Sequence, residues 1–220
     1  MLITEYFVDL QTPTGQMRVH VFHPPKLNKY PGVAVFTEIY QVTGPVQRFC
    51  RQICSQGYIV ATPESYHEFL PLGHVIPYDT PGTDLGNKLK IEKSLKGYDD
   101  DSKVLLDYLE SLSSCTGSLG ATGMCLGCAF DKRVKAAVCY FPTDIHKESL
   151  SSGSDSLERT GEIKGELLMI FGKQDTHIPQ EGRLKIYTNL VEKNVLFSWC
   201  EFQAQHAFIR DESSKGRIVL

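Results

Sequence analysis

The sequence predicts an α/β fold: a three-layer sandwich in which helices flank a mostly parallel sheet. Strand-like and helix-like segments alternate along the chain, and several strand-like segments are short continuous apolar runs, which are typical of strands buried on both faces. The chain has 220 residues, of which 41% are hydrophobic, so it is long enough to bury a substantial core. We therefore expect residues 1–220 to form a single domain.

An antiparallel hairpin is expected at the start of the chain, at one edge of the sheet. Residues 2–9 and 17–22 are rich in strand-forming side chains. The sequence Thr12-Pro-Thr-Gly15 between them combines a proline, which fixes φ, with a permissive glycine, so it predicts a turn.

The next elements are expected to be a buried strand at 32–37, a helix at 45–56 and a strand at 58–62. Val46, Phe49 and Ile53 recur at helical spacing on this helix, and Gly57 follows it where a glycine favours helix termination. Residues 63–96 are rich in Pro, Gly and Tyr and predict a long irregular excursion, a kind of segment that is often functional.

A further helix is expected at 98–112. Its first residues, Tyr98-Asp-Asp-Asp101, place acids near the positive end of the helix dipole. Its apolar face consists of Val104, Leu105, Tyr108, Leu109 and Leu112. The remaining elements are expected to be strands at 118–124, 134–141 and 167–171, a helix at 179–192 and a last strand at 195–202, with a surface loop at 146–165.

Composition excludes several classes of partner. The chain has 23 basic and 26 acidic residues and a formal net charge of −3, so it has no positive field to hold a nucleic acid. No apolar stretch approaches the roughly 18 residues that a membrane helix needs, and the first ten residues lack the features of a signal peptide. We therefore expect a cytoplasmic protein with neither nucleic acid nor membrane as a partner.

The seven cysteines are an odd number, scattered over a chain much larger than a disulfide-stapled domain. We therefore expect reduced thiols. Cys50 and Cys54 lie four residues apart on the predicted helix at 45–56 and are expected to be core residues.

A candidate nucleophile follows the predicted strand at 118–124. The sequence Gly123-Met-Cys-Leu-Gly127 has the G-x-C-x-G pattern of a tight strand-to-helix turn, at which glycines allow close approach of neighbouring backbones. Cys125 would face the N-terminus of the following helix, where the partial positive charge favours the reactive thiolate. The alternative, a buried structural cysteine at a turn, fits the pentapeptide alone equally well.

Two polar residues follow later strands at the edge where α/β active sites are assembled. Asp175 follows the strand at 167–171, and His206 follows the last strand. The chain order nucleophile, acid, base is the one expected of an α/β-hydrolase, with His206 as general base and Asp175 holding the imidazole tautomer.

Four motifs together resemble the dienelactone hydrolase (carboxymethylenebutenolidase) family of the α/β-hydrolase superfamily, over nearly the whole chain. The motifs are Thr37-Glu38-Ile-Tyr, Gly123-Met-Cys-Leu-Gly127, Gly172-Lys-Gln-Asp175 and His206-Ala-Phe-Ile-Arg210. The resemblance implies an α/β-hydrolase-like fold and a Cys-His-Asp triad that cleaves small esters or lactones.

The resemblance also implies roles for residues around the triad. Glu38 would control the thiol in the resting enzyme, Arg210 would contact a substrate carboxylate, and the backbone N–H groups of Ile39 and Leu126 would form an oxyanion hole. Acyl transfer of this kind needs no cofactor and no metal.

The chain departs from the family pattern in three places. No arginine occurs between Arg51 and Arg133, where similar proteins carry a second arginine; Lys88 or Lys90 is the candidate replacement, and broad specificity for small esters is expected. Only a few residues separate Gly127 from the strand near Val134, so the helix after the nucleophile is short, and we expect the next strand to be displaced. The third departure is at residues 216–220, where the sequence stops and the resemblance leads us to expect a final covering helix, so we expect this helix to be missing.

Three alternatives remain open at this point. The protein could be an inactive or ligand-binding relative of the hydrolases. Cys125-Leu-Gly-Cys128 has the C-x-x-C spacing of a thiol–disulfide redox site, although the single tryptophan, Trp199, lies far away in the sequence. A metal site formed by these two cysteines with His67 and His74 is a weaker alternative, because no second closely spaced pair completes four ligands.

Overall fold

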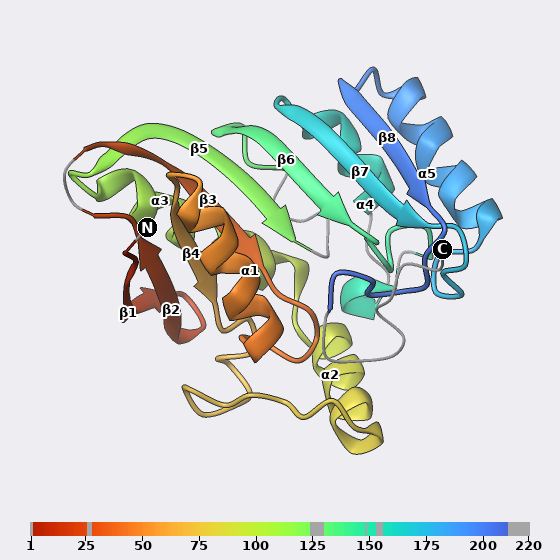
Figure 1. Ribbon diagram of the computed structural model, residues 1–220. Helices are drawn as coiled ribbons and strands as arrows, with labels where there is room; N and C mark the ends of the chain where they lie inside the picture. The colour runs from red at the N-terminus through yellow and green to blue at the C-terminus, as the bar shows by residue number, and fades with distance from the viewer. Residues whose placement is uncertain (1, 26–27, 124–129, 148, 153–155, 211–220) are drawn as a thin grey trace.

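The computed structural model describes residues 2–25, 28–123, 130–147, 149–152 and 156–210, and in this part of the chain eight strands form one sheet (Figure 1). The strands are β1 (Thr4–Thr12), β2 (Gly15–His23), β3 (Tyr30–Phe36), β4 (Ile59–Pro63), β5 (Cys115–Gly123), β6 (Val134–Tyr140), β7 (Glu166–Gly172) and β8 (Phe197–Phe202). Their order is β1-β2-β4-β3-β5-β6-β7-β8. The pairs β1–β2 and β2–β4 are antiparallel and the others parallel, which confirms the predicted mostly parallel sheet.

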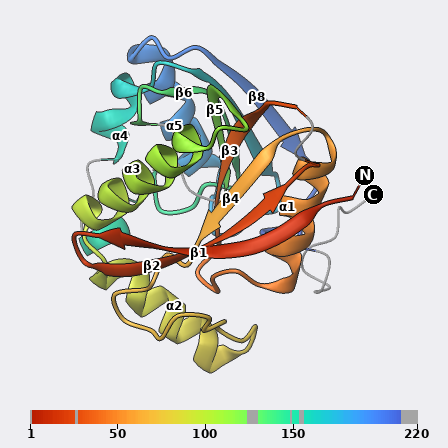
Figure 2. The same ribbon diagram turned by 90° about the vertical axis from the view of Figure 1, so that its left-hand side faces the viewer.

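Helices cover both faces of the sheet, as a three-layer sandwich requires (Figure 2). On one face lies α1 (Gly44–Ser55), whose buried Val46, Cys50 and Cys54 pack with apolar residues of β2, β3 and β4. On the other face lie α3 (Leu95–Ser111) and α5 (Gln180–Glu192), whose leucines and isoleucine join the main core. The predicted end of α1 is confirmed, because Gly57 has a φ of +91°, a conformation that favours glycine.

The hairpin at the start of the chain is confirmed as an edge element. Thr12 pairs with Gly15 across the turn, and β1 is the outermost strand. Along β2, Met17, Val19 and Val21 are fully buried on the face covered by α3. Every second side chain of β2 therefore packs in the core and anchors the strand.

The excursion expected at 63–96 contains a helix, α2 (Thr80–Glu92), so the expectation of an irregular segment was wrong for its second half. Asp79 caps this helix by accepting a hydrogen bond of 2.7 Å from the backbone N–H of Gly82. A Pro and a Gly at the first helical turn, which we took as breaking signals, are compatible with a helix start. In Figure 1, α2 lies at the end of the sheet toward which β5 points.

The next helix, α3, begins at Leu95 rather than at residue 98, because Ser94 caps it through a hydrogen bond from the Gly97 N–H (3.0 Å). The acids at 99–101 therefore lie beyond the first turn, so their predicted interaction with the helix dipole was wrong. Asp101 instead turns into the protein, where it is almost fully buried.

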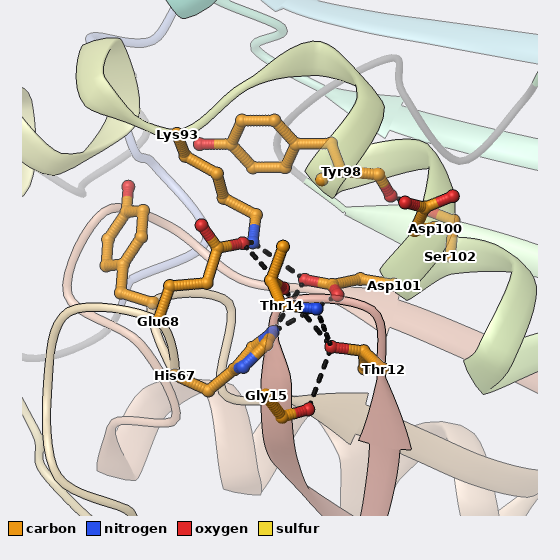
Figure 3. Close-up of polar contacts among 12 residues, drawn as sticks. Thr12, Thr14, Gly15, His67, Glu68, Lys93, Tyr98, Asp100, Asp101 and Ser102 are labelled. Atoms are coloured by element: carbon orange, nitrogen blue, oxygen red, sulfur yellow. Dashed lines mark hydrogen bonds and ion pairs between the residues drawn. The ribbon is translucent and has the colours of Figure 1, made fainter.

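A buried charge cluster holds the excursion against α3 and the hairpin turn (Figure 3). The ammonium group of Lys93, which has no exposed surface, forms ion pairs with Glu68 and with Asp101 (2.8 Å). His67 Nε2 lies at hydrogen-bond distance, 3.1 Å, from Oδ1 of the same Asp101. The Thr14 hydroxyl of the hairpin turn donates a hydrogen bond to Glu68 at 3.1 Å. The cluster around the buried cation therefore joins three segments: the hairpin turn, the excursion and α3.

The strand that follows the short connection, β6, lies in the sheet between β5 and β7. Residues 124–133 join β5 to β6, and β6 nonetheless pairs in parallel with both β5 and β7. The expected displacement of this strand is therefore wrong. A parallel crossover usually takes about a dozen residues or more, so the shortness of this connection is confirmed, while residues 124–129 lie outside the described part of the chain.

The segment at 146–165 is more ordered than the expected surface loop. It contains α4 (Ser156–Arg159) and two short 3₁₀ turns, and Leu157 and Thr160 are buried. The expectation that a final covering helix is missing concerns the end of the chain, and residues 211–220 lie outside the described part.

Five cysteines are described, and each is a free thiol, as predicted: Cys50, Cys54, Cys115, Cys139 and Cys200. Cys50 and Cys54 are fully buried core residues. Burial raises the pKa of Cys54 to about 11 and that of Cys50 further, so both thiols are unreactive. In the described ranges, no helix is long and apolar enough to span a membrane.

Candidate active site

Two loops that follow β7 and β8 bring Asp175 and His206 into direct contact. The loops are joined by backbone hydrogen bonds, from the N–H of Lys173 to the carbonyl of Phe202 (2.8 Å) and from that of Gln174 to the carbonyl of Ala204 (3.0 Å). His206 Nδ1 lies 2.8 Å from Asp175 Oδ2. Gly172 makes this approach possible, because a Cβ there would lie 2.4 Å from the Ala204 carbonyl oxygen.

The carboxylate of Asp175 is buried and fully engaged. Only 1% of its side chain is exposed, and its Oδ1 accepts the backbone N–H groups of His177 (2.8 Å) and Ile178 (3.3 Å). Burial opposes ionisation, but the hydrogen bond and charge of His206 and the His177 N–H outweigh it and lower the pKa of Asp175. An ionised Asp175 holds the proton of His206 on Nδ1 and leaves Nε2 to accept a proton.

Arg210 and Glu38 form an ion pair although 172 residues separate them. Nε of Arg210 donates to Glu38 Oε1 at 3.2 Å, and the second guanidinium nitrogen donates to Oε2. The guanidinium also lies over the rings of Tyr40 (5.0 Å) and Tyr78 (4.3 Å). A turn at 206–209, with Ala207 at a φ of 58°, directs Arg210 back toward the loop after β3.

The loop after β3 presents two polar groups without partners. The backbone N–H of Ile39 has no acceptor in the described part of the chain. The hydroxyl of Thr37 is buried and has no hydrogen-bond partner there either. Free donors of this kind suit a carbonyl oxygen that develops negative charge.

Most of these groups, but not the buried Asp175, line one cavity of about 470 Å³. Glu38, Ile39, His206 and Arg210 contribute to it together with Thr37. Aromatic and aliphatic side chains form much of the remaining wall: Phe36, Tyr40, Tyr66, Leu95, Tyr98, Phe130, Phe141, Ile145 and Leu150. A mostly apolar cavity with a few convergent polar groups is suited to a small organic ligand.

Of the two lysines expected as candidate replacements for the missing arginine, Lys90 lies at the cavity and Lys88 does not. Lys90 lines the cavity and lies 3.0 Å from both carboxylate oxygens of Asp144, whereas Lys88 is exposed and pairs with Glu92 on the surface. Arg159 also lines the cavity, from the segment at 146–165, and is paired with Asp99 at 3.0 Å. This position of Arg159 in the cavity wall was not predicted, because the sequence indicates a surface loop for that segment.

Cys125 and Leu126 lie outside the described residues, so the expected nucleophile and second oxyanion donor stay predictions. Gly123, the last residue of β5, supports the predicted close approach at this turn. A Cβ at this position would lie 2.6 Å from the carbonyl oxygen of Phe36. The backbone before Cys125 therefore runs directly beside the end of β3.

Two groups of side chains in the described ranges have the proximity of metal ligands. In the first, His67, Glu68 and Asp101 surround the ammonium of Lys93, which already supplies the cation, and His74 is not among them. In the second, Asp175, His177 and His206 belong to the loops just described, and His206 is already hydrogen-bonded to Asp175.

Comparison with known proteins agrees with the fold. The model of the dienelactone hydrolase family matches residues 17–218. A Saccharomyces cerevisiae protein named "Putative carboxymethylenebutenolidase" is 47% identical over 236 residues, which cover 99% of this chain and 86% of the relative. A Synechocystis protein of the same name is 25% identical over 205 residues, which cover 90% of this chain and 83% of the relative.

The match to the yeast protein also shows a difference in length. The aligned stretch of 236 residues is longer than the whole chain of 220, so the relative carries residues inside the stretch that this chain lacks. This agrees with internal shortening.

Solved structures show the same fold at low sequence identity. A Klebsiella pneumoniae structure described as "Putative Dienelactone Hydrolase" superposes with a TM-score of 0.85 at 21% identity, over 98% of this chain and 92% of that chain. A dienelactone hydrolase-like promiscuous phosphotriesterase from metagenomic libraries gives 0.77 at 16% identity, over 94% and 85%.

Proposed function

The chain belongs to the dienelactone hydrolase family, a family of carboxylic ester hydrolases, and from this premise we propose that it cleaves small esters or lactones through Cys125, His206 and Asp175. The observation that carries the proposal is the hydrogen-bonded pair of Asp175 and His206, of which His206 lines the cavity. The substrate is a small molecule, and we propose that residues 1–220 act as one domain.

In the proposed reaction, His206 accepts the proton of the Cys125 thiol while the sulfur attacks the carbonyl carbon. The ionised Asp175 stabilises the imidazolium that forms and keeps its Nδ1–H oriented. The leaving alcohol takes the proton from His206, and water then hydrolyses the thioester with His206 again as base. The thiol, the imidazole and backbone donors suffice, so the proposal includes no cofactor.

The unpartnered N–H of Ile39 supports its proposed role in the oxyanion hole, with that of Leu126 as the second donor. Glu38 and Arg210 add a response to substrate charge. Because Arg210 is already paired with Glu38, a substrate carboxylate would compete with Glu38 for the guanidinium, and a neutral ester would not. Small neutral esters are therefore proposed as substrates alongside carboxylate-bearing lactones.

The test is turnover of 4-nitrophenyl acetate and of an enol-lactone by the wild type and three variants. We expect Cys125→Ala and His206→Gln to lower kcat/KM by about a thousandfold or more, and Cys128→Ala to change it little. Unchanged turnover in Cys125→Ala would contradict the nucleophile assignment.

A second candidate function is ligand binding without catalysis, which the short connection after the nucleophile favours. It predicts no turnover in any of these proteins. The redox alternative predicts reduction of insulin disulfides that is lost in both Cys125→Ala and Cys128→Ala. The same variants therefore separate the three functions.

A further inference from the structure

His177 stacks on the imidazole that is proposed to act as the base. The ring centroids of His177 and His206 lie 4.3 Å apart with an angle of 31° between the planes. Phe141 contacts His206 edge-to-face at 5.0 Å. The base therefore has two aromatic neighbours in addition to its hydrogen bond to Asp175.

The position of His177 is set by the acid loop. Its backbone N–H donates to Asp175 Oδ1 at 2.8 Å, and its own Nδ1 lies 3.6 Å from the same oxygen. The side chain is 62% exposed and lines the cavity. His177 lies two residues after Asp175 in the chain, and it contacts both this buried acid and the ring of the base His206.

Charged and titratable groups face His177 from four elements: Asp175 on its own loop, His206 after β8, Lys147 after β6 and Lys90 on α2. Burial and then the charge of His206, with smaller effects of both lysines, lower the pKa of His177, while Asp175 acts in the opposite direction. Two imidazoles at this separation disfavour simultaneous protonation, so a proton on one ring opposes a proton on the other.

We propose that His177 is a positioning residue: its ring holds the imidazole of His206 in place, and its charge state decides whether His206 can accept the thiol proton. The inference rests on the proposed function, because it concerns the same base. In the step concerned, the S–H bond of Cys125 breaks and an N–H bond forms on His206. A neutral His177 allows the His206 imidazolium to form, and a protonated His177 disfavours it by charge repulsion.

Two substitutions separate the ring from its charge. His177→Phe keeps an aromatic ring but removes the proton site, and His177→Ala removes both. His74→Gln is the matched control, since His74 is an exposed histidine outside the cavity. All proteins are compared by the pH dependence of kcat/KM for 4-nitrophenyl acetate.

We expect the acid limb of log kcat/KM to lie at higher pH in the wild type and in His74→Gln than in both His177 variants, because a proton on either ring inactivates the wild type. We expect the plateau to fall about tenfold in His177→Ala and to stay within about threefold of wild type in His177→Phe. Equal acid limbs in the wild type and His177→Phe would overturn the charge effect, and equal plateaus in all proteins would overturn the positioning role.

An NMR titration of the histidine ring signals keeps this test independent of turnover. In the wild type, the His177 signal should titrate below the ordinary histidine range, and in His206→Gln at higher pH, because that variant removes the charge of His206. If no protein turns over ester while this coupling is seen, the proposed function fails and the coupling stands. The same His177 titration in both proteins overturns the inference.

Discussion

Thr37 carries a hydroxyl group that is buried in the cavity wall and has no hydrogen-bond partner in the described ranges. Leaving a buried polar group unpaired costs stability, so retaining it is reasonable where a ligand supplies the missing partner. The hydroxyl lies one residue before Glu38 and two before Ile39, which places it beside the proposed oxyanion donor.

We predict that Thr37→Val leaves the free energy of unfolding unchanged or slightly higher, because valine has nearly the same shape and no unpaired group. The KM of an ester substrate should rise about threefold to tenfold, in line with the loss of one hydrogen bond. Urea unfolding and steady-state kinetics measure the two effects. A loss of stability with unchanged KM would show that the hydroxyl has a structural role.

His146 predicts a dependence of stability on pH. Both of its ring nitrogens are buried and have no hydrogen-bond partner among the residues that the structure describes. Gly182 packs so closely that a Cβ would lie 2.6 Å from the ring. Burial and then the charge of Lys147 lower the pKa of His146, against a smaller opposing effect of Asp144. Because the unfolded chain has the higher pKa, about 6.5, the unfolded state binds more protons below that pH.

The free energy of unfolding should therefore decrease as the pH falls below about 6.5. We expect the urea midpoint at about pH 5.5 to be lower than at about pH 7.5, and this difference to be smaller in His146→Leu. His74→Gln, an exposed histidine variant, should keep the full difference. An unchanged difference in His146→Leu would assign the effect to other groups.

At the scale of elements, the Lys93 cluster joins the β1–β2 turn, the excursion and α3 (Figure 3). Lys93→Met would leave the carboxylates of Glu68 and Asp101 in the interior without their cation. Breaking one partner of a buried ion pair costs about 3–5 kcal/mol, so we expect a loss of that order in the free energy of unfolding.

Lys96→Met is the control for this prediction. Lys96 pairs with Asp100 one turn along α3, but 78% of its side chain is exposed, so its removal should cost about 0.5 kcal/mol or less. The double variant Lys93→Met/Asp101→Asn should recover part of the loss, because it removes one of the two unpaired charges. Equal effects of Lys93→Met and Lys96→Met in urea unfolding would contradict the buried-pair account.

Element identity was predictable wherever the apolar pattern is local. The hairpin, α1, α5 and the parallel strands follow from alternation or helical spacing in their own residues. The pattern failed at α2, where only three residues, Gly82, Gly86 and Leu89, are buried, so there is little apolar periodicity to detect. Leu89 packs in a small separate cluster with Tyr40, Tyr66 and Ile76, which brings the excursion against the loop after β3.

At the scale of the whole molecule, the main question is the short connection between β5 and β6. The sheet tolerates it, since β6 keeps its parallel pairing on both sides. The yeast relative nevertheless contains additional residues within the aligned stretch. A longer connection would bury more apolar surface, at roughly 25 cal/mol per Å², in a fold that is stable by only about 5–15 kcal/mol.

We predict that inserting about six helix-forming residues after Gly127, with an apolar face at i, i+3 and i+4, raises the urea midpoint and the esterase activity. An insertion of equal length made of Gly and Ser is the control and should not raise either. A lower midpoint with the helical insertion would mean that the short connection is the native design.

The sequence by itself determined the α/β class, most strand positions and the chain order of Cys125, Asp175 and His206, because periodicity and turn chemistry are properties of neighbouring residues. Only the tertiary structure decided which distant groups meet. The structure places Lys90 and Arg159, but not Lys88, in the cavity wall, and it brings the ring of His177 against that of His206. These positions depend on how α2 and the loops are arranged at the sheet edge. Such contacts join residues far apart in the chain, and local pattern carries no information about them.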